Sequence, residues 1–256
     1  MTRLVAAEWI KIRSVRSTGW ALALTLALSA GLGYLIGRSF RATFATISAD
    51  PRQHFDPLFA TFYSLTIGQL ALVALAVLLV TGEYTTGTVG ASLAAVPKRG
   101  LFYASKVLTG ALLAGSVAVV TVLATFATAQ AGLGPHGTSL RGAGVPAAVA
   151  GACLYLTLIF LFATGLAGLL RGPVPALGIL IPLLFLGSQG LGNVPKLKAI
   201  AQYLPDQAGM VVMHIAGQGP DPRFSRPYGP WTGLAIMALW TVAALVAGYL
   251  RMRRDP

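Results

Sequence analysis

Six uncharged, apolar stretches occupy most of the chain, and almost every ionisable residue lies between them. A helix rises about 1.5 Å per residue, so roughly 20 residues cover the ~30 Å hydrocarbon core of a bilayer. A backbone in lipid must also satisfy its own hydrogen bonds, and a helix does so within one segment. The pattern predicts an all-α membrane protein with six transmembrane helices over about 18–36, 60–81, 107–130, 146–170, 174–191 and 231–250, within the stretches Thr18–Ile36, Pro57–Gly82, Val107–Pro135, Gly142–Leu170, Gly172–Pro195 and Pro227–Leu250.

Composition supports this interpretation and excludes other classes. The stretches are too long and too evenly apolar for barrel strands, which alternate over roughly ten residues. Only 10% of the 256 residues are charged, against roughly 25% in soluble domains. We therefore expect residues 1–256 to form a single membrane domain. The net charge is +12, but the chain has no soluble domain on which basic residues could cluster to bind nucleic acid. We therefore attribute the charge to membrane topology and expect no nucleic-acid partner.

The distribution of basic residues predicts the orientation of the chain. With the N-terminus in the cytosol, the inner segments 1–17, 82–106, 171 and 251–256 carry eleven Lys and Arg residues. The outer segments 37–61, 136–141 and 196–226 carry eight over more residues. Because inner loops of membrane proteins are enriched in Lys and Arg, both ends are predicted to be cytosolic.

The N-terminal segment, residues 1–17, carries apolar residues at helical spacing. Val5, Trp9 and Ile12 are flanked by basic residues, which favours an amphipathic helix lying in the plane of the inner membrane surface. The alternative is that these residues are only the positive flank of the first span. The apolar run that follows is too long for a typical signal peptide, so an uncleaved anchor is expected.

The connection between the second and third spans contains enough residues for a cytosolic helix. Val89 and Leu93 share one helical face, and Glu83 lies where the second span reaches the inner surface. We expect the Glu83 charge to stay solvated or to pair with a base such as Arg99. A short helix held at a fixed place could receive a push from a soluble partner, whereas the alternative is an interfacial cap on a loop.

The connection between the fifth and sixth spans, residues 196–226, is unusually apolar. Its central part, 199–220, carries one formal charge, Asp206, which we expect to cap a helix. We predict short re-entrant helices at the outer membrane boundary. A seventh span is the alternative, but Asp206, Gly209 and His214 would interrupt it.

Little in the sequence points to chemistry. Gln69 and Gln189 are polar exceptions within spans, and they either bond across helices or line a pathway. The chain has no phosphate-loop motif and no His-Glu-x-x-His motif, and its one cysteine, Cys153, cannot form a thiolate metal site alone. No carboxylate lies well inside a predicted span to act as a proton relay. We therefore expect neither an enzyme nor a metal site nor a bound cofactor.

Three segments carry a resemblance to a known family. They are the basic N-terminal segment, the run from Gly82 to Thr88 with 94–100, and the run from Tyr203 to Gly209. In this order, with six spans, the chain resembles over nearly its whole length the permease subunits of ATP-binding-cassette exporters of the type-2 membrane class.

The resemblance implies roles for named residues. It assigns coupling to an ATPase to Glu83, Tyr84, Thr86, Gly87, Thr88, Val89, Leu93, Lys98 and Arg99, an in-plane helix to Val5, Trp9 and Ile12, and an outer gate to Tyr203, Pro205, Asp206 and Gly209. Gln69 and Gln189 are possible pathway residues.

The resemblance also implies partners and a location. ATP and magnesium would bind to a separate ATPase subunit, and a second permease chain would complete the pathway in a bacterial plasma membrane. The alternatives are a membrane anchor, sensor or immunity protein on the same scaffold, and, least supported, an intramembrane hydrolase.

Overall fold

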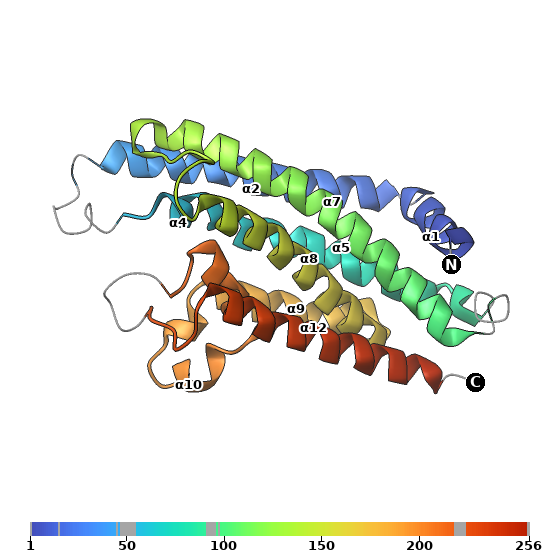
Figure 1. Ribbon diagram of the computed structural model, residues 1–256. Coiled ribbons are helices and arrows are strands. Elements are labelled where there is room, and N and C mark those ends of the chain that lie inside the picture. Colours follow the sequence, from blue (N-terminus) through green and yellow to red (C-terminus); the bar gives the residue numbers. More distant parts are fainter. Residues whose placement is uncertain are drawn as a thin grey trace.

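The computed structural model describes residues 2–14, 16–44, 46, 55–90, 96, 98–217 and 224–254, and within them the regular structure is helical (Figure 1). The all-α prediction is confirmed for these residues. The α-helices are α1 (Thr2–Ser14), α2 (Arg16–Thr43), α4 (Pro57–Phe62), α5 (Leu65–Thr85), α7 (Arg99–Leu133), α8 (Val145–Leu170), α9 (Pro173–Ser188), α10 (Lys198–Ala201), α11 (Pro205–Gly209) and α12 (Pro230–Arg253), with short 3-10 helices η1 (Gly134–His136), η2 (Leu191–Asn193) and η3 (Met210–Met213).

Five helical stretches in the described part of the chain are long and apolar enough to cross a membrane. The prediction of six such spans is wrong at the fifth. Helix α9 has 16 residues and covers only about 24 Å. It ends at Ser188 because Gly190 takes a left-handed conformation, with φ of 94°, that a continuing helix does not allow. The five stretches are Ser17–Thr43, Pro57–Thr85, Arg99–His136, Val145–Leu170 and Pro230–Arg253.

Two helices run well beyond the predicted spans. Helix α2 continues past Arg38 and Arg41, and α7 already begins at Arg99. Charged residues end a stretch that can lie in hydrocarbon, but they do not end a helix, because Arg and Lys have good helix propensity in water. The apolar pattern therefore located these helices and underestimated their lengths.

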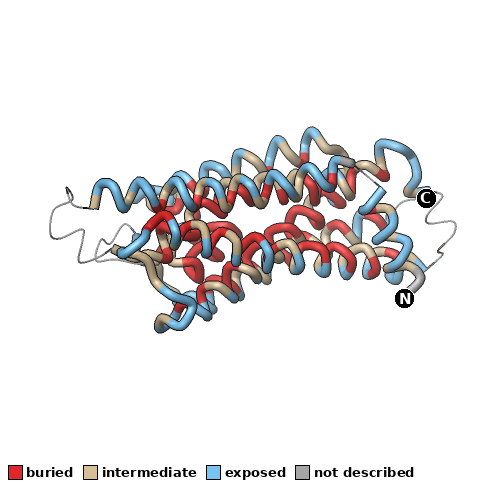
Figure 2. The backbone as a smooth tube through the Cα atoms, turned by 90° about the horizontal axis from the view of Figure 1, so that it is seen from above, coloured by how far each residue is buried: buried red, intermediate tan, exposed pale blue. Residues whose placement is uncertain are grey.

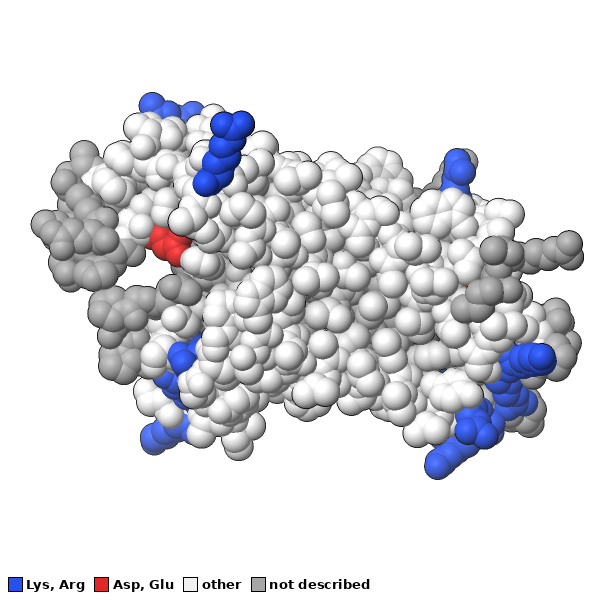
Figure 3. All heavy atoms as spheres, viewed as in Figure 1, with Lys and Arg blue, Asp and Glu red and all other residues white. Residues whose placement is uncertain are grey.

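The helices form an elongated bundle with α5 and α8 at its centre. In the view of Figure 2 buried residues line the middle of the bundle and exposed residues face outward. In the most apolar window of Pro57–Thr85, 67% of the residues are buried inside the chain, against 17% for Ser17–Thr43. The face in Figure 3 has Lys and Arg at its two ends and an uncharged belt between them. Such a belt is what a bilayer requires.

Helices α2 and α7 approach each other closely at a pair of glycines. A Cβ atom built on Gly37 would lie 2.6 Å from the Ala129 carbonyl oxygen, and one on Gly132 would lie 2.5 Å from the Tyr34 carbonyl oxygen. No real side chain fits at those distances. Small residues at this crossing let the two backbones touch, as in other membrane helix pairs.

The N-terminal and C-terminal residues lie at the same end of the bundle, which we call the terminal end, and α4 and α10 lie at the opposite, far end (Figure 1). At the terminal end, two arginines hold the last turn of α12. Arg99 donates to the Arg253 carbonyl at 2.9 Å, and Arg171 donates to the Arg251 carbonyl at 2.8 Å. The final carbonyls of a helix have no partner within it, so these bonds join α12 to the start of α7 and the end of α8.

Candidate functional site

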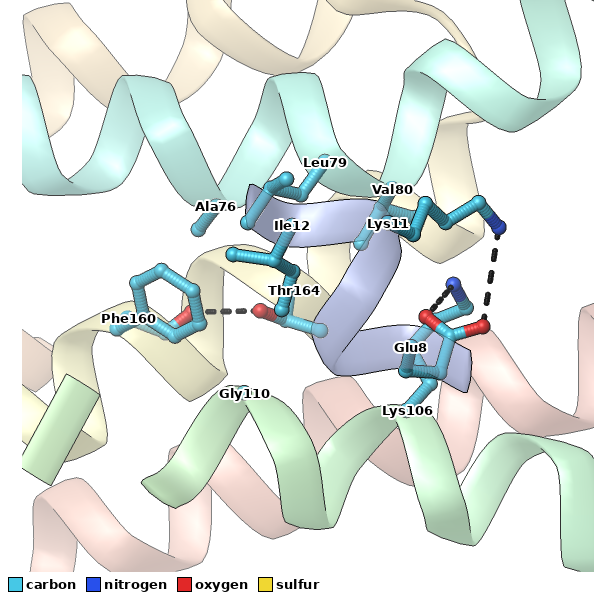
Figure 4. A pocket seen from close by; sticks show the side chains of 10 residues that line it. All are labelled: Glu8, Lys11, Ile12, Ala76, Leu79, Val80, Lys106, Gly110, Phe160 and Thr164. Carbon is cyan, nitrogen blue, oxygen red and sulfur yellow. Dashed lines mark hydrogen bonds and ion pairs between the residues drawn. The ribbon is translucent and has the colours of Figure 1, made fainter. Parts of the chain in front are cut away.

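Four charged side chains gather at the terminal end and form what we call the charge cluster: Glu8 and Lys11 of α1, Glu83 of α5 and Lys106 of α7. Lys11 and Lys106 both donate to Oε1 of Glu83. Lys106 also donates to Oε2 of Glu8 at 3.1 Å, and Lys11 lies 3.7 Å from Oε1 of Glu8. The last two contacts are drawn in Figure 4.

The charge cluster is neutral overall, and this allows it to be buried. Glu83 is 4% exposed, and the side chain of Lys106 is 13% exposed. A lone charge in such surroundings would lose several kcal/mol of solvation, whereas two acids and two bases compensate each other. The cluster therefore links three helices through partners that cannot be removed one at a time without cost.

A small, mainly apolar cavity of about 30 Å³ lies beside the charge cluster. Ile12 of α1 points into it between Ala76 of α5 and Phe160 of α8 (Figure 4). The Thr164 hydroxyl is already occupied, because it donates to the Phe160 carbonyl at 2.9 Å. Helix α1 forms one wall of this cavity.

The expected pairing of Glu83 with a base is confirmed, but the bases are Lys11 and Lys106 and not Arg99. Glu83 is neither solvated nor paired with Arg99, because the N-terminal helix folds over the end of α5 and brings Lys11 to it. Arg99 instead donates to the Arg253 carbonyl. From the sequence alone, nothing indicated that α1 would lie against α5 and α7 at this point.

The other predicted coupling residues lie along the connection between α5 and α7 or next to it. Tyr84 is half-buried, and the Arg171 guanidinium lies 5.5 Å from the centre of its ring. Val89 is half-buried and Lys98 is exposed where α7 begins. Thr86, Gly87 and Thr88 are also exposed, whereas Leu93, with the other residues of 91–95, is outside the described part of the chain. The coupling role stays a prediction.

The predicted N-terminal helix exists as α1, but its apolar residues have different surroundings. Ile12 is buried, Val5 is half-buried, and Trp9 is 40% exposed. Ile12 thus packs against the bundle, while part of Trp9 is left for lipid or a partner. The position of α1 in the plane of a membrane stays a prediction.

Short helices do occupy the connection between α9 and α12, yet the expected role of Asp206 is wrong. Helix α11 begins at Pro205 with Leu204 at its N-cap, so Asp206 lies inside the first turn. Its carboxyl is fully buried, and Gln207 donates to its Oδ2 at 3.0 Å. Burial raises the pKa of Asp206 to about 6, although hydrogen bonds from Gln207 act in the opposite direction.

The remaining residues of the predicted outer gate divide into two groups. Pro205 and Gly209 are buried with Asp206, and Gly209 is so close to the Tyr155 ring that a Cβ there would lie 2.5 Å from it. Tyr203 is 41% exposed, and its carbonyl accepts from the Trp240 indole at 2.9 Å. Three of the four residues thus form one packed unit.

The two predicted pathway glutamines do not share a site. Gln69 is fully buried inside the bundle, where the Tyr155 hydroxyl donates to its Oε1 at 2.6 Å. Gln189 lies at the end of α9 and lines a second cavity, of about 220 Å³, together with Gln207 and Arg226. For Gln69, the alternative of a bond across helices is therefore what the structure has.

Sequence reasoning missed two residues. Lys106 completes the charge cluster, and the signal was its place at the entry of an otherwise uncharged span, facing one of only two glutamates in the chain. Tyr155 bonds Gln69, and the signal was a hydroxyl in the middle of an apolar run. Buried polar side chains need partners, so each one predicts another.

Comparison with known proteins does not assign the chain to a family. No protein-family model matches the chain, and no curated protein matches it either. Among the described residues no three His, Cys, Asp or Glu side chains gather where they could hold a metal ion. The chain is a helical protein whose five long apolar helices are consistent with a multi-pass membrane protein.

Proposed function

We propose that this chain is the membrane subunit of an ATP-driven exporter of the ATP-binding-cassette type, with ATP and magnesium bound by a separate ATPase subunit. The observation that carries the proposal is the charge cluster at the end of α5. It supports a chain that moves an amphipathic cargo in response to a push from outside the membrane, without performing chemistry itself.

The cluster provides a path for force. The connection from Glu83 to Arg99 leaves α5 directly at the cluster. Glu83 cannot be displaced alone, because Lys11 and Lys106 would then lose a buried partner. A partner that moves this connection therefore moves α1, α5 and α7 together. The cavity beside the cluster lies between these helices and would change shape with them.

A second permease chain belongs to the proposal. The cavity at the charge cluster and the cavity at Gln189 have no lining residue in common, and each lies near a different end of the bundle. Within the described residues neither of these two cavities runs along the bundle. A pathway between two copies, or between this chain and a related one, fits that arrangement. We place both termini in the cytosol of a bacterium, with the chain in its plasma membrane.

The experiment is reconstitution in vesicles with the ATPase encoded next to this chain. Glu83→Gln should leave insertion intact and lower cargo-stimulated ATP hydrolysis about tenfold, since a factor of ten corresponds to about 1.4 kcal/mol of lost coupling. Asp56→Asn, which alters a carboxyl at the far end, is the matched control and should keep the wild-type rate of cargo-stimulated ATP hydrolysis. Equal rates in both variants would remove the coupling role from Glu83.

The same vesicles separate the alternatives. ATP hydrolysis without directional movement of any amphipathic cargo would support the anchor, sensor or immunity function. Failure of every neighbouring ATPase to bind the chain would exclude the proposal altogether.

A further inference from the structure

Asp206 is an unusual ionisable group in the far end of the bundle. Its side chain has no exposed surface, and its Oδ1 has no hydrogen-bond partner. Its Oδ2 accepts from the Gln207 amide at 3.0 Å. None of the ion pairs found among the described residues includes it. A buried carboxylate without a counter-charge is strongly disfavoured, and protonation is the simplest relief.

The carboxyl lies directly behind the wall of the second cavity. A Cβ atom on Gly187 would lie 1.7 Å from Oδ2 of Asp206, so only a glycine leaves room for the carboxyl at the end of α9. Gln207 also donates to the Gly187 carbonyl at 2.8 Å. Gly187 and Gln207 both line the cavity. The packing of Asp206 therefore determines the position of Gly187 and Gln207 in the wall of the second cavity.

The groups around Asp206 do not supply a positive charge at bonding distance. From α8 it faces Tyr155, whose hydroxyl is already bonded to Gln69, and from the segment just before α12 it faces Tyr228. The Arg226 guanidinium is directed to Asn193 Oδ1, at 2.8 Å. At the end of η3, His214 pairs with Asp56, 2.7 Å away. These are the titratable and charged neighbours that the described elements packed against Asp206 provide.

We propose that Asp206 is a proton-binding site, and that the bound proton holds α11 and η3 against the bundle and keeps the wall of the second cavity in place. The proposal does not rest on transport or on an ATPase. When the carboxyl is neutral, the segment packs without a buried charge. When it is ionised, the segment gains by releasing Asp206 to water.

The sign follows from linkage. The packed segment raises the pKa of Asp206 from 3.8 to about 6 through burial, so packing is fully favoured below the lower value and weakens as pH rises to the upper one. Above that value the loss is complete and no longer changes. The ratio of packed to released segment should fall on the order of 100-fold across this window.

Hydrogen exchange of the full chain in nanodiscs tests the proposal. The amides of 208–213 are measured in wild type and in Asp206→Asn at the same pH, so that the chemical pH dependence of exchange cancels in the ratio. The exchange rate of wild type divided by that of Asp206→Asn should be near one at about pH 4. This ratio should rise on the order of 100-fold by about pH 6 and then stay level. Asp56→Asn is the control, because it also neutralises a far-end carboxyl, and it should not reproduce this window.

A second measurement needs no variant at position 206. Infrared or NMR titration of wild type labelled with carbon-13 aspartate should show one of its five aspartates protonated up to about pH 6. A flat exchange ratio would overturn the coupling to packing. Titration of all aspartates near their ordinary pKa would overturn the proton site itself. This result needs only wild type, so it holds even if Asp206→Asn fails to fold.

Discussion

At the scale of single residues, Asp56 shows how one carboxylate serves two purposes. It caps α4 by accepting from the Leu58 backbone N–H at 2.8 Å, and it pairs with His214 at the end of η3. Burial alone would raise the pKa of Asp56, but the hydrogen bonds from His214 and Leu58 together lower it. Asp56 therefore joins the start of α4 to the short helices that precede α12.

This lowered pKa predicts a specific acid sensitivity. A carboxyl whose folded pKa lies below 3.8 contributes stability above that value, and the contribution is lost as pH falls through the folded pKa. Asp56→Asn keeps the cap, because Asn caps helices about as well as Asp, but it removes the charge. We expect wild type to have a higher melting temperature than Asp56→Asn near neutral pH, and the difference to shrink as the pH falls below 3.8. A difference in melting temperature that is the same at every pH would contradict this.

The charge cluster predicts a non-additive pair of substitutions. Glu83→Gln or Lys106→Met alone leaves a charge without its partner and should lower the free energy of unfolding by roughly 3 kcal/mol. The double variant should lose clearly less than the sum of the two, because neither charge is then unpaired. Lys98→Met, at an exposed position, is the control and should change stability by less than about 0.5 kcal/mol. Additive losses in detergent unfolding curves would show that the pair is not coupled.

Single residues were predictable as exceptions but not as partners. A glutamine within an apolar run and a glutamate at its end stood out in the sequence, as Gln69 and Glu83 did. Their partners come from other helices, 86 residues away for Tyr155 and 72 for Lys11. Which faces meet depends on how each helix is rotated about its axis, and the nearly uniform apolar runs contain little information about rotation.

At the scale of elements, the crossing of α2 and α7 predicts opposite effects of one substitution type. Gly132→Ala places a Cβ where a backbone oxygen already lies, so the two helices must separate and stability should fall by about 1–3 kcal/mol. Gly31→Ala, on the same helix pair, meets nothing within 4 Å and should stabilise α2 by about 0.5–1 kcal/mol. Unfolding of the two variants in one detergent provides the comparison. Equal effects would mean that the crossing is looser than described.

Helix existence followed from the apolar pattern, whereas helix length did not. Five of the six predicted spans are long helices, because a run of about 20 apolar residues has few other solutions. Helix α9 is the exception, since the left-handed conformation of Gly190 ends it within a run that hydropathy alone treats as continuous. Glycine conformation is a local property that an average over the run conceals.

At the scale of the whole molecule, the orientation can be tested on intact cells. In a Cys153→Ala background, a cysteine in place of Arg141 should react with a membrane-impermeant maleimide, because it lies between α7 and α8 on the predicted outer side. A cysteine in place of Arg254 should react only after the membrane is permeabilised. The reverse pattern would invert the orientation, and labelling of both would place the two ends of the bundle on one side.

The sequence predicted the class of the molecule better than its function. The charge-free belt and the shared end of the two termini agree with a multi-pass membrane protein. The transport function depends on a resemblance in three segments, and one of these, the run from Gly82 to Thr88 with 94–100, lies partly outside the described residues. The choice of cargo depends on the shape of the cavity, and a run of apolar residues does not predict that shape.

The arginines that bond the last carbonyls of α12 give the C-terminus an unexpected importance. Arg99 lies in the first turn of α7, and Arg171 is the residue after α8. The last four residues of α12 therefore hold two other helices in place through hydrogen bonds. Trimming the chain after Leu250, a common step in preparing membrane proteins, would deprive both guanidinium groups of these acceptors in a single cut. Tags and fusions belong beyond Pro256, on a linker long enough to leave these two hydrogen bonds intact.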